Sequence, residues 1–88
     1  MIICTTNPEA APGGTVLEAY IEHKIGSTIQ DIIADSPERF RIIEAEALRD
    51  LIVMSEVAGT DASVILGPHT LDNPDCRRLV SGHCSLIP

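Results

Sequence analysis

Residues 26–58 read GSTIQDIIADSPERFRIIEAEALRDLIVMSEVA and contain the longest helical pattern of the chain. Ser36 is a typical N-cap residue, and Pro37 suits the first helical position, where its missing N–H costs nothing. Gly59 tolerates a positive φ and so marks the helix end. Apolar residues recur at steps of three and four between these limits: Phe40, Ile43, Ala47, Leu51, Met54 and Ala58, with Leu48 beside them. The pattern predicts one long amphipathic helix that buries this stripe.

Arg41 is the most suggestive side chain of that helix. It follows Phe40, which the stripe directs into the core, and is rotated about 100° from it around the helix axis. Arg41 therefore lies at the edge of the apolar stripe. There it either lines a crevice or extends into solvent, and the pattern alone leaves both interpretations open.

Length and composition predict a single domain spanning residues 1–88. The chain is 44% apolar, with one Phe, one Tyr and no Trp, so its core consists of aliphatic side chains. A chain this short buries only about two-thirds of the surface exposed on unfolding, so we expect a homo-oligomer or a partner chain to add stability. The net charge of −7 and only six Lys and Arg residues argue against nucleic acid or a membrane surface as partner.

Cysteine usage and hydropathy predict a cytoplasmic protein. The chain has an odd number of cysteines, Cys4, Cys76 and Cys84, and they form no CxxC motif. This usage favours reduced thiols over disulfides. Their spacing relative to the three histidines does not fit a zinc site, so we expect no metal. No run approaches the roughly 18 apolar residues of a membrane helix, and the first residues lack the basic segment of a signal peptide.

The remaining elements alternate along the chain. Three short apolar runs indicate buried strands at residues 1–5, 64–66 and 84–87, and helical patterns occupy residues 15–25, 28–34 and 74–81. Alternation of this kind predicts an α/β fold with a small parallel sheet of about three strands, right-handed crossovers and helices packed on it. Ligands of such sheets bind beyond the carboxyl ends of the strands. We expect residues 7–14 and the turn Gly67-Pro68-His69 at that edge, within reach of Arg41.

Residues 8–15, PEAAPGGT, invite comparison with the phosphate-binding loop G-x-x-x-x-G-K-[ST]. Gly13 and Thr15 fit, but Pro8 replaces the first glycine and Gly14 replaces the lysine that reaches the phosphates. Prolines also remove N–H donors from a loop whose purpose is to direct them at phosphate. We therefore expect a degenerate loop without an ATP or Mg²⁺ site.

Several motifs, taken in order from Glu18 to Ile87, resemble those of shikimate kinase, a P-loop phosphotransferase that transfers the ATP γ-phosphoryl group to shikimate. Residues 21–26 match the family's Ile-Glu-x-x-x-Gly motif, and residues 74–77 match its Pro-x-x-Arg motif. Residues 28–33, 39–44 and 66–69 stand in, with substitutions, for the family's Ser-Ile-x-x-Ile-Phe, Glu-x-x-Phe-Arg-x-x-Glu and Gly-Gly-Gly motifs. Their order and spacing carry the resemblance. It implies a reduced P-loop-kinase-like fold.

The resemblance also implies roles for four residues. Arg41 takes the position of the arginine that grips the shikimate carboxylate, a bidentate task suited to guanidinium, and Glu44 is expected to orient it. Glu18 takes the position of the acidic residue that binds a substrate hydroxyl. Gly67 is the glycine that remains of the family's triple glycine, while Val16 replaces the first acidic residue of the family.

Three hypotheses follow. The first is a non-catalytic shikimate-kinase-like domain that binds a small carboxylate such as shikimate through Arg41, Glu18, Gly67 and Glu44. The second is a fragment or subunit of an ATP-dependent phosphotransferase that another chain completes, with ATP and Mg²⁺ as its cofactors. The third is an oligomerisation domain without a ligand, in which Arg41 and Glu44 form a surface ion pair. We predict binding without turnover and assign no catalytic residue.

Overall fold

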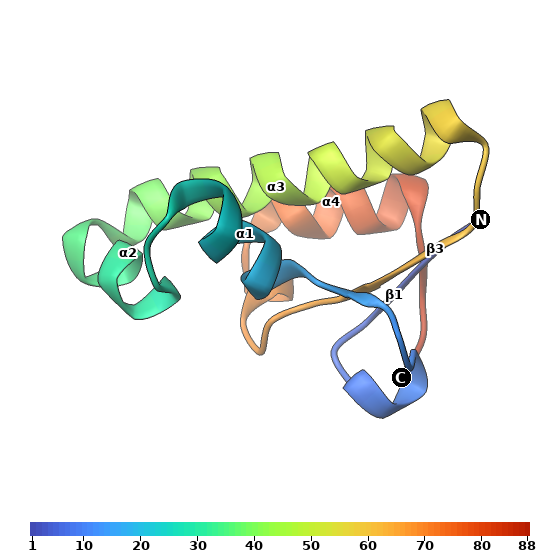
Figure 1. Ribbon diagram of the computed structural model, residues 1–88, viewed down its shortest axis with the longest axis horizontal. Helices are drawn as coiled ribbons and strands as arrows, with labels where there is room; N and C mark the ends of the chain where they lie inside the picture. The colour runs from blue at the N-terminus through green and yellow to red at the C-terminus, as the bar shows by residue number, and fades with distance from the viewer.

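The computed structural model describes all residues from Met1 to Pro88. It contains a four-stranded sheet, four α-helices and two short 3₁₀-helices (Figure 1). The elements are β1 (Ile2–Thr5), η1 (Pro8–Ala10), β2 (Thr15–Val16), α1 (Leu17–Ile25), α2 (Ile29–Asp35), α3 (Pro37–Ala58), β3 (Ala62–Ile65), η2 (Thr70–Asp72), α4 (Pro74–His83) and β4 (Ser85–Leu86). The predicted α/β class is confirmed.

The sheet is entirely parallel, with strand order β2–β3–β1–β4. The sheet has one strand more than the sequence predicts. This additional strand is β2, whose two residues, Thr15 and Val16, are expected from the sequence to belong to the helix that follows. Thr15 pairs with Val64 and Val16 pairs with Ile65, so β2 lies at one edge of the sheet. Two residues are too few to show the alternation by which strands are recognised in sequence.

The connections explain where the helices lie. The crossovers from β2 to β3 and from β3 to β4 progress in the same direction across the sheet, so right-handed connections place α3 and α4 on one face. Figure 1 shows both helices above the strands and the loop that contains η1 on the other side. That loop leads from β1 back past β3 to β2, so the connections that follow the neighbouring strands β1 and β3 run in opposite directions on opposite faces of the sheet. Their carboxyl ends form the edge where α/β proteins bind ligands.

Helix α3 begins and ends as predicted. Ser36 accepts a hydrogen bond through Oγ from the N–H of Arg39 at 3.2 Å, and Gly59 has a φ of 65°. The predicted apolar stripe is partly wrong, because Met54 is 52% exposed and Ala58 is also exposed. The buried residues of α3 are Glu44, Ala47, Leu48, Ile52 and Ser55. Two polar members of this set have hydrogen-bond partners inside the protein, which an apolar pattern cannot reveal.

Two smaller expectations are also corrected. The helical pattern directs Ile33 inward, but Ile33 is 40% exposed, whereas Ile32 of the same helix is buried. Helix α4 passes through Gly82, which the pattern marks as its end, and continues to His83, with Cys84 as its C-cap. Glycine need not end a helix when its φ is negative, and only Gly13, Gly26 and Gly59 have positive φ.

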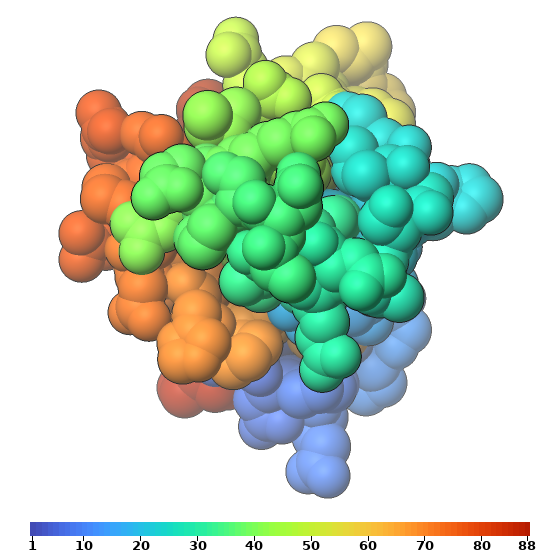
Figure 2. Space-filling model, turned by 90° about the vertical axis from the view of Figure 1, so that its left-hand side faces the viewer, coloured from blue at the N-terminus to red at the C-terminus, as the bar shows by residue number.

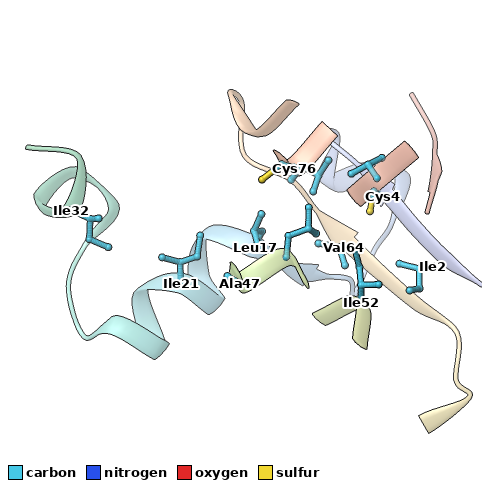
Figure 3. Packing of buried hydrophobic residues seen from close by; sticks show 12 residues of the cluster. Ile2, Cys4, Leu17, Ile21, Ile32, Ala47, Ile52, Val64 and Cys76 are labelled. Atoms are coloured by element: carbon cyan, nitrogen blue, oxygen red, sulfur yellow. The ribbon is translucent and has the colours of Figure 1, made fainter. Parts of the chain in front are cut away.

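The core lies between the sheet and the helices. Figure 3 shows Leu17, Ala47, Ile52 and Val64 gathered between α1, α3 and β3, with Ile32 further out along α2. None of the helices has the length and hydropathy that a membrane span requires.

Candidate functional site

A cavity of about 300 Å³ separates the α2–α3 corner from the segment after β3. Its lining residues are Ile33, Pro37, Phe40, Arg41, Glu44, His69, Asp72 and Asn73. In Figure 2 the green surface of α2 and early α3 meets the orange surface of the segment after β3 on this side of the molecule. Arg41 lines this cavity and is also exposed to solvent, so each of the two interpretations that the sequence leaves open holds in part.

The guanidinium of Arg41 has no partner within the chain. It forms neither an ion pair nor a hydrogen bond, although Glu38 and Glu44 lie three positions away on the same helix. By contrast, Arg39 pairs with Asp35 at 3.6 Å. Arg41 therefore carries five free donors at the edge of the cavity, and guanidinium donors of this kind bind carboxylates bidentately.

Glu44 does not orient the Arg41 side chain, which corrects the expected role. Glu44 is 4% exposed, and its two carboxylate oxygens bind different neighbours. Oε2 accepts from the hydroxyl of Thr70 at 3.0 Å, and Oε1 accepts from Nδ2 of Asn73 at 3.2 Å. Glu44 thus holds the segment after β3 against α3, and so fixes one wall of the cavity.

Asn73 connects this network to the backbone of Arg41. Its Oδ1 accepts from the N–H of Asp75 at 3.1 Å, which caps α4. Its Nδ2 donates to the backbone oxygen of Arg41 at 2.9 Å as well as to Glu44. Each amide atom faces partners of the matching type, so the orientation of the side chain is determined. The sequence identifies Asn73 only as a cap.

Glu18 and Gly67 meet next to this network. The N–H of Gly67 donates to Thr70 Oγ1 at 2.8 Å, so Thr70 links Gly67 to Glu44. A Cβ atom on Gly67 would lie 3.0 Å from Cδ of Glu18, which means that only glycine lets the carboxylate approach so closely. Neither Glu18 nor Gly67 lines the cavity itself.

Glu44, Gly67 and Glu18 therefore lie around Thr70, whereas Arg41 joins the network only through its backbone oxygen. Two residues that sequence reasoning missed make these connections. Thr70 and Asn73 supply every side-chain hydrogen bond to Glu44. Thr70 is fully buried within a polar, proline-flanked segment, and nothing in the sequence pattern distinguishes it from a loop threonine. At the mouth of the cavity, His69 Nδ1 lies 3.1 Å from Asp72 Oδ2, and both side chains are exposed.

The loop after β1 has almost no donor to offer a phosphate. The N–H groups of Asn7, Glu9, Ala10, Ala11 and Gly14 all bind acceptors between residues 5 and 11. Pro8 and Pro12 have no N–H, which leaves the N–H of Gly13 as the one free donor between residues 7 and 14. A phosphate-binding loop requires several N–H groups that converge on one point.

Neither a reactive thiol nor a metal cluster accompanies the site. Burial raises the pKa of Cys76 to about 12, and the nearby Glu44 carboxylate contributes to the rise, so its thiol is protonated at neutral pH. No three His, Cys, Asp or Glu side chains come together in a way that could hold a metal ion.

Comparisons with known proteins leave the family open. No protein-family model matches this chain, and no curated protein or solved structure is significantly similar to it.

Proposed function

We propose that this chain is a shikimate-kinase-like binding domain that holds a small hydroxylated carboxylate, such as shikimate, in the cavity beside Arg41 and does not transfer phosphate by itself. The observation that carries the proposal is the unpaired guanidinium of Arg41 on the wall of a cavity. A ligand carboxylate would take up donors that the protein leaves free.

The other walls suit a small ring-bearing acid. Ile33, Pro37 and Phe40 provide apolar surface, while Asp72 and Asn73 provide polar atoms that hydroxyl groups can bind. The volume of about 300 Å³ lies at the lower limit of small-molecule pockets, which favours a metabolite over a nucleotide. Glu18, whose carboxylate approaches Gly67, would contact a ligand group that extends past Gly67.

Phosphoryl transfer does not belong to this proposal. It depends on a lysine and N–H donors around the phosphates together with Mg²⁺. Residues 7–14 contain no lysine and bind nearly all their N–H groups internally. A kinase built on this chain would need a second chain to supply ATP and Mg²⁺ binding. We place the domain in the cytoplasm, where thiols such as those of Cys4 and Cys76 stay reduced.

Isothermal titration with shikimate at millimolar concentration tests the carboxylate site. We expect measurable binding to the native chain and a loss of roughly tenfold or more in Arg41→Ala, because a charge-assisted pair of hydrogen bonds is removed. Arg77→Ala is the matched control, since Arg77 is also exposed and unpaired but lies outside the cavity. It removes the same charge and should bind as the native chain does.

Two results would count against the proposal. One is the absence of heat with the native chain, and the other is equal affinity in the Arg41→Ala and native chains. The amide of shikimate adds a second check, because it keeps the ring but lacks the charge and should bind at least roughly tenfold more weakly. A coupled ADP-release assay should show no turnover by the purified chain, and clear turnover would contradict our view of residues 7–14.

A further inference from the structure

The solvent-facing side of α3 carries a second ordered pattern, separate from the cavity. Six residues recur there at alternating steps of three and four: Arg39, Ile42, Glu46, Arg49, Val53 and Glu56. All six are exposed, including the two apolar members, Ile42 at 59% and Val53 at 44%. The spacing is that of a helix-pairing seam, in which one narrow stripe meets a second helix, but four of these six positions are charged, so charge pairing would have to contribute to the contact.

The seam is complementary to itself in one orientation. Two antiparallel copies of α3 can be related by a twofold axis that passes between Ala47 and Leu48. Each residue of one copy then lies opposite the partner's residue at the same number of positions on the other side of the axis. Ile42 then faces the partner's Val53, and Glu46 faces the partner's Arg49. Arg39 likewise faces the partner's Glu56. Every charge meets the opposite sign, and apolar side chains meet apolar ones.

We propose that the outer face of α3 is the interface of an antiparallel homodimer, and that a second copy of this chain is its occupant. A parallel pair is disfavoured, because it places Glu46 against the partner's Glu46 and Arg49 against the partner's Arg49. The antiparallel register, in contrast, pairs opposite charges and also pairs apolar side chains.

The central charges are available for this role. Glu46 and Arg49 are three positions apart on one helix, yet they form no ion pair with each other or with any other residue. The outer charges are engaged within the chain: Arg39 with Asp35 at 3.6 Å, and Glu56 with His83 at 3.1 Å. Both of those pairs are solvent-exposed and therefore weak, so the inner residues determine the register.

A groove beside the seam provides room for the partner. It lies between α3 and α4, has a volume of about 450 Å³, and includes apolar surface from Ile42, Ala45 and Leu79. In the antiparallel register the partner's Val53 lies over Ile42, next to this apolar surface. Arg41 is rotated about 100° from Ile42, so the carboxylate cavity stays open and the two proposals can fail independently.

Sedimentation equilibrium on charge variants tests the interface. Glu46→Arg creates two like-charge contacts across the twofold axis, and Arg49→Glu does the same with the opposite sign. Each variant alone should weaken the dimer by at least roughly tenfold. An equimolar mixture of the two should recover a dimer, because the mixed pair restores opposite charges in both contacts. Asp31→Lys and Arg77→Glu change the net charge equally at exposed sites away from the seam and should dimerise as the native chain does.

The register is tested by cross-linking. A mixture of Ile42→Cys and Val53→Cys chains should form a disulfide-linked dimer under a mild oxidant, beyond the level that the native cysteines give. Ile42→Cys alone should not, because its two copies lie about 11 positions apart along the pair, about 16 Å. The proposal is overturned if the native chain is monomeric at submillimolar concentration, if the charge variants dimerise unchanged, or if Ile42→Cys cross-links to itself.

Discussion

The hydroxyl of Thr70 donates a hydrogen bond to Oε2 of Glu44 at 3.0 Å, between residues 26 positions apart. Thr70 also accepts from the N–H of Gly67, and Asn73 donates to the other oxygen of Glu44. The Glu44 carboxylate is thus buried among neutral donors, without a cation. A formed hydrogen bond adds only a little to stability, whereas a buried acceptor that is left unpaired costs much more free energy. Replacing a single donor atom of this network should therefore destabilise the protein.

Asn73→Asp should destabilise the protein by about 2–4 kcal/mol, although aspartate is as good a helix cap as asparagine. The new carboxylate can still accept from the N–H of Asp75. Its second oxygen, however, replaces Nδ2 and faces two acceptors, the backbone oxygen of Arg41 and the carboxylate of Glu44. Urea unfolding at pH 7 measures the difference.

Asn7→Asp is the matched control for this substitution. Asn7 caps η1 by accepting from the N–H of Glu9, but the bond is exposed and Nδ2 donates to no buried acceptor. The free energy of unfolding of the Asn7→Asp variant should differ from that of the native protein by less than about 0.5 kcal/mol. Lowering the pH should narrow the stability deficit of the Asn73→Asp variant, because the introduced carboxyl can then bind a proton and donate it. Equal effects at the two positions would show that Asn73 acts only as a cap.

Thr70→Val should cost about 1–3 kcal/mol of stability, since it keeps the side-chain shape and removes the donor to Glu44 and the acceptor for Gly67. Thr70→Ser keeps the hydroxyl and should cost less than about 1 kcal/mol. The comparison separates hydrogen bonding from packing. If valine and serine behave alike in thermal unfolding, the hydroxyl is not what stabilises the segment after β3.

Local signals predict the fold well wherever they act over short distances. Ser36 and Asn73 each accept a hydrogen bond from the first turn of the helix that follows, as expected of caps. Before α2 the cap is Thr28 and not Ser27, the residue that the sequence pattern suggests. The buried side of α3 is harder to predict, because Glu44 and Ser55 are buried through bonds to Thr70 and to the backbone of Thr60. Such partners are remote in sequence or lie beyond the helix, and apolar periodicity contains no trace of them.

In the candidate site, too, local patterns predict some features, while contacts between residues remote in sequence determine the others. Helix geometry places Arg41 at the edge of a stripe, and the strand pattern places Gly67 at the end of a strand. That Glu44 binds Thr70 and Asn73 instead of Arg41 depends on how the segment after β3 folds back across α3. Glu38 and Arg41 are three positions apart on α3, as are Glu46 and Arg49, yet neither pair forms an ion pair. Exposed pairs gain too little to fix two flexible side chains.

Gly67→Ala should destabilise the protein by about 1–3 kcal/mol, because the added Cβ would lie 3.0 Å from Cδ of Glu18 and 3.2 Å from Oγ1 of Thr70. Gly82→Ala is the control. Gly82 lies inside α4, and a Cβ atom added there would meet no other atom within 4 Å, so alanine should stabilise the protein by about 0.5–1 kcal/mol.

A double substitution identifies which contact matters at Gly67. If the Glu18 side chain is the main obstacle, Gly67→Ala should cost less in a Glu18→Ala background than alone. Additive costs would instead locate the strain at Thr70, whose hydroxyl is held by Gly67 and Glu44. Urea unfolding of the four chains decides between the two.

Stability should fall with rising pH above about 9, because the folded protein keeps protons that the unfolded chain releases. Burial raises the pKa of Cys4, where Cys84 contributes as well, and raises the pKa of Cys76 to about 12, from an ordinary value of 9.0. Between about pH 9 and 12 the unfolded state therefore binds fewer protons than the folded state, and the free energy of unfolding decreases by up to about 1.4 kcal/mol per pH unit for each thiol. Urea unfolding at about pH 8, 9 and 10 measures the slope. Cys76→Ala should reduce it by the share of one thiol, whatever its effect on stability at neutral pH, and an unchanged slope would mean that Cys76 ionises as readily in the folded chain as in the unfolded one.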